Sequence, residues 1–351
     1  MSFSKEVFSA NSRMENGELV IAGCKATLLA KEFETPLFVL DEEDFRSRAS
    51  SWKGALHRHF GENAGEVYYA AKSFICVEVA KMVKESGIGI DVCTGGELAV
   101  ALAADFPVER IELHGNNKSL SEIEEAIKLG VSRIVVDSIQ EISRVQEIAS
   151  RLGKNQKVLI RITPGVEAHT HEAISTAHED VKFGLSIATG AAWKAIELIE
   201  ASSNISLQGF HCHIGSQIFN TEGYEIAIKR IVELNAKFRD SFNRELSEFD
   251  IGGGFGIAYL PDETTMDPDA ALAKLSKVIK TEFANKKLAL PKISIEPGRA
   301  ISGPTTTTLY EVGTTKHIEL DGGGSRHYIA VDGGMSDNAD RKSTRLNSSH
   351  T

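Results

Sequence analysis

Residues 67–91 of this chain read VYYAAKSFICVEVAKMVKESGIGID: a short apolar run, a helix-patterned segment, and a second short run that ends in Asp91. This alternation recurs up to residue 296, giving eight short β-rich runs, each ending in or followed by a polar or glycine residue. The runs are VYYA (67–70), IGID (88–91), IELH (111–114), IVVD (134–137), VLIRI (158–162), LQGFH (207–211), FDIG (249–252) and ISIE (293–296). Their order predicts an α/β fold with a (β/α)8 TIM-type barrel and an active site at the carboxyl ends of the strands.

Polar, charged or glycine residues end or follow the eight runs, and a closed barrel would bring them to one rim. They are Lys72, Asp91, His114, Asp137, Arg161, His211, His213, Gly252, Gly253, Gly254, Glu296 and Arg299. The connection between residues 163 and 190 is too long for a regular one, so it predicts a rim loop of the kind that carries substrate-specific residues. Its histidines, His169, His171 and His178, have no acidic ligand pattern beside them, and we expect no metal site.

Composition narrows the class of ligand. The chain has 351 residues, of which 42% are hydrophobic, and a formal net charge of -10. An acidic chain without a basic stripe argues against nucleic acid or a membrane surface as a partner, so we expect a small-molecule substrate. We find no signal-peptide pattern and no apolar stretch near the roughly 20 residues of a membrane span. The four cysteines are scattered without CxxC spacing, which favours free thiols in a reducing cytoplasm.

The chain is expected to divide into a barrel and a smaller β unit. Residues 1–36 contain two strand-like pieces, GELVIAG and ATLLA, and no helix of useful length. Residues 37–300 hold the barrel, preceded by an amphipathic helix that runs from the acidic DEED segment to about Phe60. Residues 301–338 alternate in strand fashion again, in TTTTLYEVGTTKHIEL and RHYIAVDGG. We expect the two terminal segments to form one β domain together.

The last residues of the chain do not follow a foldable pattern. Leu346 is the only strongly apolar residue among the final sixteen, so no core is expected there. A β domain that begins near residue 301 would need about a hundred residues, and about fifty remain. We therefore expect an incomplete β domain in a truncated chain. Residues 339–351 are interpreted as a disordered native tail or as translated adaptor sequence.

Two glycine-containing motifs indicate a phosphate site. GGGFG at 252–256 directly follows the seventh run, where barrels often bind phosphate through backbone N–H groups. Taken alone, such a turn is explained equally well by backbone φ values that only glycine adopts easily. One run later, EPGR brings Glu296 to a strand end and Arg299 to a second anion-capable turn. An acid and a cation therefore flank the expected phosphate, which belongs to a substrate or to a cofactor.

Lys72 distinguishes between these two sources of phosphate. Its neighbours Ala70, Ala71 and Ser73 are small, so we expect desolvation to lower the pKa of its ammonium group and make it a Schiff-base nucleophile. Most loop lysines are simply solvated, and it is the position at the end of a barrel strand that favours the reactive role. A reactive lysine, a phosphate site, and a carboxylate, Glu296, for a pyridine nitrogen are the parts that hold pyridoxal 5′-phosphate.

Several motifs, in order, resemble the diaminopimelate decarboxylase family of fold-type III pyridoxal-phosphate enzymes. The resemblance covers about residues 20–338 and rests on YYAAKS, DVCTGGEL (91–98), HGNNKS (114–119), KFGLS (182–186), HCHIGSQ (211–217), GGGFG, EPGR and VDGGMSDN (331–338). It implies an alanine-racemase-like barrel with a β domain, in a cytoplasmic homodimer. It also implies decarboxylation of meso-2,6-diaminopimelate to L-lysine and carbon dioxide through an external aldimine, the last step of lysine biosynthesis.

The resemblance also implies roles for single residues. Lys72 would form the internal aldimine, and His213 would stack on the cofactor ring; both would be catalytic. Ser216 would help the glycine turn hold the phosphate, Glu296 would pair with the pyridinium nitrogen, and Arg299 would also reach the substrate. The implied cofactor-binding residues are Lys72, His213, Ser216, Gly252, Gly253, Gly254, Glu296, Pro297, Gly298 and Arg299.

Other interpretations stay open at this point. A sister decarboxylase of ornithine, arginine or carboxynorspermidine, an amino-acid racemase, or a non-catalytic pyridoxal-phosphate-binding protein would share the barrel. His213 alone is equally well a hydrogen-bonded rim histidine, Glu97 can cap a helix, and His211 and Cys212 are interpreted as structural.

The sequence departs from the family pattern after VDGGMSDN. Relatives carry a substrate-binding arginine and tyrosine there, and farther on a cysteine–glutamate motif donated across a dimer interface. Ala339 and Asp340 stand here instead. We therefore expect this chain to be weakly active or inactive.

Overall fold

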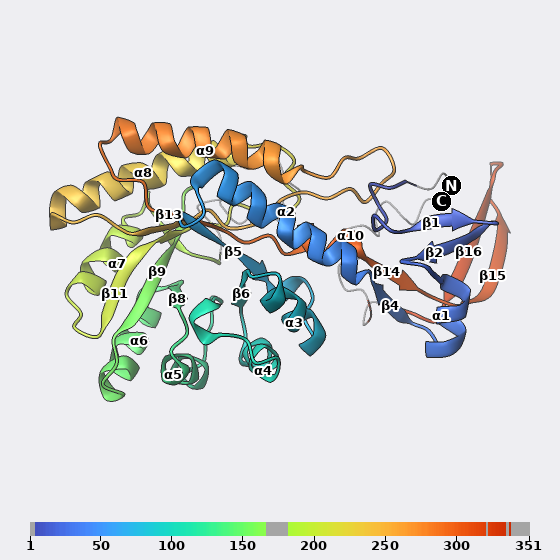
Figure 1. The fold of residues 1–351 in the computed structure, drawn as a ribbon, viewed down its shortest axis with the longest axis horizontal. Coiled ribbons are helices and arrows are strands. Elements are labelled where there is room, and N and C mark those ends of the chain that lie inside the picture. Colours follow the sequence, from blue (N-terminus) through green and yellow to red (C-terminus); the bar gives the residue numbers. More distant parts are fainter. Residues whose placement is uncertain (1–3, 166–181, 321, 335–336, 338–351) are drawn as a thin grey trace. The chain divides into compact units, whose positions relative to one another are not determined.

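The computed structural model describes residues 4–165, 182–320, 322–334 and 337 (Figure 1). The chain separates into two compact units, one of residues 45–303 and one that combines residues 1–44 with residues 304–351. The expectations for His169, His171 and His178, and for the tail at 339–351, lie outside the described residues.

Eight parallel strands form a closed barrel in the unit of residues 45–303. They pair in the order β9-β11-β12-β13-β5-β6-β7-β8, and β8 also pairs with β9, which closes the ring. The strands are β5 (Gly65–Ala70), β6 (Gly89–Val92), β7 (Ile111–Leu113), β8 (Arg133–Val136), β9 (Gln156–Thr163), β11 (Ile205–His211), β12 (Glu248–Asp250) and β13 (Lys292–Ile295). Each apolar run forms one of these strands, so the predicted barrel is confirmed.

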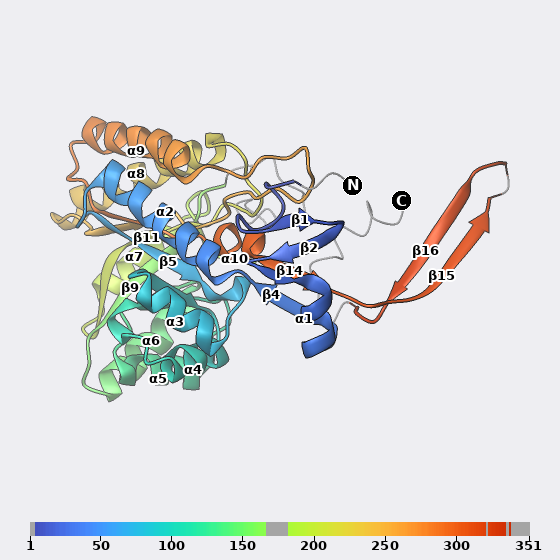
Figure 2. The ribbon, with the colours of Figure 1, turned by 45° about the vertical axis from the view of Figure 1, so that its right-hand side comes forward.

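Helices follow the strands and cover the outside of the barrel (Figure 2). They are α2 (Glu42–Phe60), α3 (Val77–Glu85), α4 (Gly95–Ala103), α5 (Leu120–Leu129), α6 (Ile139–Arg151), α7 (Ala191–Glu200), α8 (Glu222–Phe242), α9 (Pro268–Asn285) and α10 (Arg299–Thr305). A short strand, β10 (Leu185–Ser186), extends β9, and single helical turns lie at η1 (Ala71–Ser73) and η2 (Val108–Arg110). Strands β6 and β7 are buried along their whole length, as expected for parallel strands covered by helices.

Capping residues start several helices within a few residues of a strand end. The Thr94 side chain accepts a hydrogen bond from the backbone N–H of Glu97 and begins α4, and Ser138 does the same for Glu141 at the start of α6. Because the chain turns outward so soon, a residue between strand and cap, such as Asp137, stays at the rim of the barrel.

The unit of residues 1–44 and 304–351 joins both ends of the chain through β pairing. Strand β4 (Leu37–Leu40) pairs antiparallel with β14 (Thr306–Leu309). A three-stranded sheet contains β1 (Arg13–Glu15), β2 (Glu18–Ile21) and β3 (Cys24–Lys25). Strands β15 (Val312–Glu319) and β16 (Ser325–Val331) form an antiparallel hairpin. These antiparallel sheets are the additional β domain that the alternating terminal segments predicted.

One expectation for the N-terminal region is wrong. The segment ATLLA was interpreted as strand-like, but it lies in helix α1 (Ala26–Phe33), whose full sequence is ATLLAKEF. Alanine, leucine, lysine and glutamate are all strong helix formers, and Thr27 is the single β-branched residue of the eight. The apolar five-residue piece was too short to distinguish the two periodicities, whereas the three residues after it favour a helix.

An aromatic stack lies under the glycine turn that follows β12. Phe255, the aromatic residue of GGGFG, packs against Trp52 of α2 with ring centroids 4.3 Å apart and stacks on Tyr224 of α8 at 5.7 Å. The Tyr224 hydroxyl also donates a hydrogen bond to the Gly253 carbonyl at 2.8 Å. The three rings are almost completely buried, so the core of the barrel unit fixes this turn directly.

The substitution Gly209→Ala tests how closely strands β11 and β12 pack in the barrel. A Cβ atom at this position of β11 would lie 1.8 Å from the Glu248 carbonyl oxygen of the neighbouring strand β12. We expect Gly209→Ala to lower the free energy of unfolding by about 3 kcal/mol or more, because the two strands must separate. Urea unfolding followed by circular dichroism measures this change.

Gly54→Ala is the matched control. Gly54 lies within α2, and its added Cβ would meet only the Arg58 guanidinium, a flexible group, at 3.3 Å. We expect this variant to gain about 1 kcal/mol from helix propensity. An equal effect of the two substitutions would contradict the close packing of β11 against β12.

Candidate active site

Lys72 lies in a single helical turn, η1, directly after β5. Hydrogen bonds on both sides hold this turn: Ser73 Oγ donates to the Ala70 carbonyl at 2.8 Å, and the Tyr69 hydroxyl donates to the Phe74 carbonyl at 2.7 Å. Burial raises the pKa of Tyr69 to about 12, so this hydroxyl remains a donor. The side chain of Lys72 is exposed beyond this fixed turn.

The expected direction of the Lys72 pKa is wrong. Desolvation does act to lower the pKa of Lys72, as predicted, but the charges of Asp91 and Glu296 outweigh it and raise the pKa above its ordinary value. Both carboxyl groups come from other strand ends of the barrel, and neither is a sequence neighbour of Lys72. The ammonium is therefore held between two acids, rather than made neutral by apolar neighbours.

Asp91, the third residue of β6, is completely buried. Burial raises its pKa to about 7; the Lys72 charge opposes this shift and the Glu296 charge adds to it. Cys93 Sγ donates to Asp91 Oδ1 at 3.6 Å. Glu97 accepts from the backbone N–H of Cys93 at 2.5 Å while its own N–H is capped by Thr94, which supports the helix-capping interpretation of Glu97.

Glu296, directly after β13, lies between two imidazole rings inside the barrel. His114 Nε2 lies 3.2 Å from Glu296 Oε1, and His211 Nε2 lies 3.3 Å from Oε2. Burial raises the pKa of Glu296, but His211, His114 and Lys72 together outweigh it and hold the pKa well below its usual range. Its Oε1 makes no hydrogen bond among the described residues. The site therefore contains an ionised buried carboxylate with an unused acceptor.

The turn of Gly252, Gly253 and Gly254 leaves no room for side chains. Gly252 and Gly254 have φ angles of 74° and 100°, which favour glycine. A Cβ on Gly253 would lie 2.1 Å from the Glu296 carbonyl oxygen, and one on Gly254 would lie 2.2 Å from that of Gly215. Glycine is therefore required here by both conformation and space, and backbone N–H groups line the turn.

Three further turns meet the glycine turn. Ile218, after HCHIGSQ, donates its N–H to the Gly254 carbonyl at 2.9 Å, and the Glu296 N–H donates to the Gly252 carbonyl at 2.9 Å. Beyond Pro297, a Cβ on Gly298 would lie 2.9 Å from the Cβ of Ala70, next to the Lys72 turn. The structure thus brings together the sequence-predicted turns at 72, 213–218, 252–254 and 296–299, with Ser216 half-buried in the second.

His213 and Arg299 border this arrangement. The Gly253 N–H donates to His213 Nδ1 at 3.4 Å, and burial, with the Lys72 and Arg161 charges, lowers the pKa of His213 well below its usual value. His213 is therefore a neutral, flat ring. Arg299, at the start of α10, donates to the Tyr259 hydroxyl at 2.5 Å. Its guanidinium is a cation at the edge of the site.

Sequence reasoning underrated several residues of the site. His211 was interpreted as structural, yet it contacts Glu296. Arg161 at the end of β9 lies 3.8 Å from Asp137 and stacks over the Phe183 ring at 4.6 Å. The signal that could have identified the interior residues is a polar side chain within a short apolar run, such as Glu112 in IELH, which the burial of a strand makes costly.

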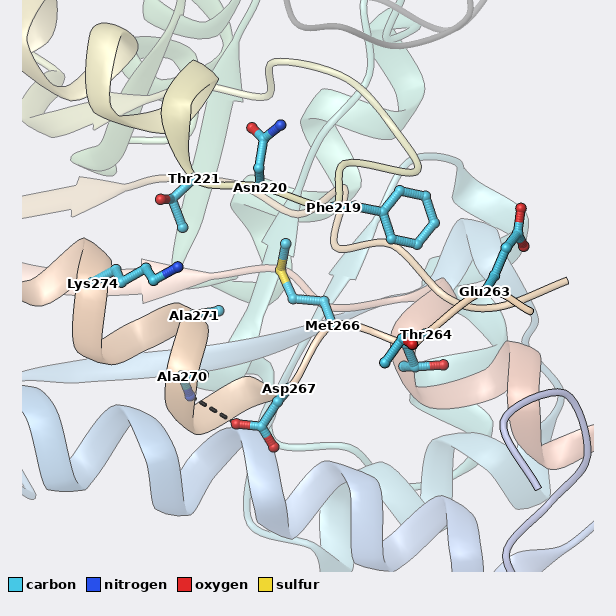
Figure 3. A pocket seen from close by; sticks show the side chains of 11 residues that line it. Phe219, Asn220, Thr221, Glu263, Thr264, Met266, Asp267, Ala270, Ala271 and Lys274 are labelled. Atoms are coloured by element: carbon cyan, nitrogen blue, oxygen red, sulfur yellow. Dashed lines mark hydrogen bonds between the residues drawn. The ribbon is translucent and has the colours of Figure 1, made fainter. Parts of the chain in front are cut away.

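A separate open pocket of about 570 Å³ lies where the loops after β11 and β12 meet α9 (Figure 3). Phe219 and Met266 contribute apolar surface to it, and Thr221 and Lys274 contribute polar atoms. The pocket borders the glycine turn, because the Met266 N–H donates to the Gly256 carbonyl at 3.0 Å. None of the sequence-predicted site residues lines it, so the convergence at Lys72 and Glu296 is the candidate active site.

Comparison with known proteins gives one consistent result. Residues 42–303 match the family model described as pyridoxal-dependent decarboxylase, pyridoxal binding domain. Diaminopimelate decarboxylase of Mycobacterium leprae is 51% identical over 331 residues, which are 93% of this chain and 69% of that protein. The Bacillus subtilis enzyme of the same name is 42% identical, covering 92% and 72%. The crystal structure of diaminopimelate decarboxylase from M. jannaschii with L-lysine superposes with a TM-score of 0.84 at 30% identity, covering 94% and 74%.

Asp91→Asn tests the electrostatic account of Lys72. With the Asp91 charge removed, desolvation is less opposed, so we expect the pKa of Lys72 to fall and its labelling by an amine reagent near pH 7 to become about tenfold faster. Mass spectrometry of labelled peptides over a pH series measures the rate. Asp137→Asn is the control, since Asp137 is not among the charges that determine the Lys72 pKa. Equal labelling of wild type and Asp91→Asn would show that Asp91 does not raise this pKa.

Proposed function

The chain belongs to the family of pyridoxal-dependent decarboxylases, and on this premise we propose that it converts meso-2,6-diaminopimelate to L-lysine and carbon dioxide at the Lys72–Glu296 site. The cofactor is pyridoxal 5′-phosphate. The matches to diaminopimelate decarboxylases confirm the resemblance found in the sequence motifs.

The described residues fit this cofactor. Glu296 carries the proposal: a buried carboxylate held ionised, with one oxygen that makes no hydrogen bond among the described residues, is suited to accept a hydrogen bond from a protonated ring nitrogen. The turn of Gly252, Gly253 and Gly254 carries no side chains, so a phosphate can come close to its backbone, as in other glycine turns that bind anions through N–H groups. Lys72 supplies an amine on a fixed turn.

The cofactor, when bound, provides an aldehyde that condenses with an amine and a ring that takes up the electrons of the breaking bond to the carboxylate. Glu296 keeps the ring nitrogen protonated, which makes the ring a stronger electron acceptor. The neutral ring of His213 can lie flat against the cofactor without adding charge. Lys72 must lose a proton before it can act as a nucleophile, and Asp91, with a pKa of about 7, is the nearby group suited to exchange that proton.

Arg299 and the remaining phosphate ligands complete the proposal. Ser216 has a hydroxyl that can donate to the phosphate beside the glycine turn, and Pro297 and Gly298 connect Glu296 to Arg299. The guanidinium of Arg299 is anchored by Tyr259 and suits a carboxylate of the substrate. Diaminopimelate has a second stereocentre with its own carboxylate and amine, so an additional cation at the rim favours it over a monocarboxylate substrate.

Assembly and location are also proposals. We infer a homodimer, because the β15–β16 hairpin exposes the apolar side chains of Val312, Tyr328 and Ile329, which are 56%, 48% and 63% accessible. Sedimentation velocity tests this, and a single species of monomer mass would contradict it.

We also propose a cytoplasmic location. All four cysteines are free, which supports a reducing cytoplasm. No helix among the described residues has both the length and the apolar character required to cross a membrane.

Lys72→Ala tests the cofactor site. We expect purified wild-type protein to develop the absorbance of covalently bound pyridoxal 5′-phosphate, and borohydride to fix the cofactor to the Lys72 peptide. The variant should lose the covalent attachment and at least about a thousandfold in decarboxylation rate, because it lacks the amine that forms the bond. Lys194→Ala, on the exposed face of α7, is the control and should behave as wild type.

A substrate panel tests the reaction. We expect carbon dioxide release and lysine formation with meso-diaminopimelate, and much slower release with ornithine or arginine. Faster turnover of ornithine, arginine or carboxynorspermidine would favour the sister decarboxylases, which the named relatives do not support. Cofactor bound at Lys72 without carbon dioxide release from any of these substrates would favour a non-catalytic binding protein.

A further inference from the structure

Two acids inside the barrel have no part in the proposed function. Glu112 of β7 and Asp250 at the end of β12 are 2% and 1% exposed. One carboxyl oxygen of each lies within 4.8 Å of the other and of an oxygen of Glu296. Three carboxyl groups therefore meet in the interior, on the side chains of three different barrel segments.

These three groups cannot all be ionised. Like charges this close, away from water, repel strongly, and carboxyl pairs at such distances share protons instead. Each group also has one buried oxygen without a hydrogen bond among the described residues: Oε2 of Glu112, Oδ2 of Asp250 and Oε1 of Glu296. Protons on two of the groups would remove the repulsion and supply hydrogen-bond donors.

The contacts indicate which group keeps the charge. Glu296 has imidazole nitrogens at 3.2 Å and 3.3 Å, from His114 and His211. Glu112 lies 3.6 Å from His114 Nε2, and Asp250 Oδ1 accepts a hydrogen bond from the Gly252 N–H at 2.6 Å. The His211 Nδ1 makes no hydrogen bond among the described residues, so its proton is best assigned to Nε2, which faces Glu296.

The pKa directions agree with this assignment. Burial, followed by the Glu296 charge, raises the pKa of both Glu112 and Asp250 well above their usual values. Burial also lowers the pKa of His114 and His211, so both rings are neutral near pH 7. Glu296 alone has a lowered pKa among the three acids.

We propose that Glu112 and Asp250 are protonated positioning residues that, together with the neutral imidazoles of His114 and His211, confine the negative charge of this cluster to Glu296. The protonation pattern belongs to the polypeptide alone. Its consequence for the cofactor rests on the proposed function: a carboxylate that cannot pass its charge to a neighbour keeps the ring nitrogen protonated over a wide range of pH.

Other charged groups face this cluster from several elements and are part of the pH argument. Lys72 follows β5, Asp91 lies in β6, and both interact with the Glu296 charge. The Tyr68 hydroxyl hydrogen-bonds to Glu112, and the charges of the Arg133–Glu248 ion pair also act on Glu112. The ion pair balances its own charge, so it leaves the Glu112–Asp250–Glu296 cluster with one net negative charge, which Lys72 faces.

Glu141 offers a matched contrast. It is 3% exposed, like Glu112, but it accepts a hydrogen bond from the Lys118 ammonium at 2.6 Å. Burial raises the pKa of Glu141, but the Lys118 ammonium opposes this shift. We therefore expect Glu141 to be ionised near neutral pH, whereas a buried acid among other acids is expected to be neutral. Replacing each by its amide separates the two cases, because the amide resembles a protonated carboxyl group.

Infrared spectroscopy of the cofactor-free protein tests the protonation. We expect wild type to show carbonyl stretches of protonated carboxyl groups that persist above pH 8, and Glu112→Gln and Asp250→Asn each to lose one such band while melting near the wild-type temperature. Glu141→Gln should lose no band and should melt markedly lower, because Lys118 is left unpaired. Absence of these bands from wild type at neutral pH would overturn the proposal, whether or not a variant folds.

The acid limb of activity tests the two imidazoles. Without the His211 donor the pKa of Glu296 rises, so Glu296 becomes protonated at a higher pH. In holoenzyme of His211→Gln or His114→Gln we expect the low-pH change in cofactor absorbance, and the acid limb of kcat, to move up by about one pH unit. His59→Gln, which removes a surface contact with Asp269, should not move them. An unmoved titration in both variants, or one equivalent of divalent metal retained by wild type and lost in His114→Gln, would overturn the proposal. If the wild-type protein did not bind the cofactor at all, the proposed function would be refuted. The infrared experiment would still test the protonation of Glu112 and Asp250, because it uses cofactor-free protein.

Discussion

The burial of one negative charge, that of Glu296, is the constraint on which the rest of the site depends. An isolated carboxylate 2% exposed in a barrel interior would take up a proton. It remains ionised because two imidazole nitrogens lie within 3.3 Å and the Lys72 ammonium faces it. The raised pKa of Lys72 is the other side of the same interaction, since the acids that the lysine stabilises also stabilise its proton.

The position of Glu296 is fixed by packing in the core rather than by contacts at the rim of the barrel. Trp52, Tyr224 and Phe255 form a buried stack, and the Tyr224 hydroxyl holds the Gly253 carbonyl. The glycine turn also packs closely against the backbone of Glu296: a Cβ on Gly253 would lie 2.1 Å from the Glu296 carbonyl oxygen. The glycine turn and the ionised carboxylate are therefore positioned by the same packed core, so the packing of helices α2 and α8 affects the geometry of the site.

Sequence reasoning succeeded where the information is local. Short apolar runs that end in polar or glycine residues predicted all eight barrel strands. The residues at the ends of these runs predicted the convergence of Lys72, Glu296 and the glycine turn. It failed where neighbours come from elsewhere in the chain: ATLLA was too short for its period to be recognised, and the pKa of Lys72 is raised by Asp91 and Glu296, which are 19 and 224 residues away. A desolvation argument drawn from adjacent residues could not include these charges, because only the closed barrel brings them near.

The barrel unit also shows two different ways of stabilising a buried acid. Glu141 is paired with Lys118, which additionally donates to the carbonyls of Gly115 and Val135, so both charges are satisfied and the pair fastens the start of α6. Near Glu296 a second lysine would neutralise the carboxylate. The carboxylate would then attract the proton of a ring nitrogen less strongly. Neutral imidazoles lower the pKa of the carboxylate without cancelling its charge, and protonated acids beside it do not compete for the proton of the cofactor. A structural acid is therefore best paired with a cation, whereas an acid that must act on a bound molecule is best surrounded by neutral groups.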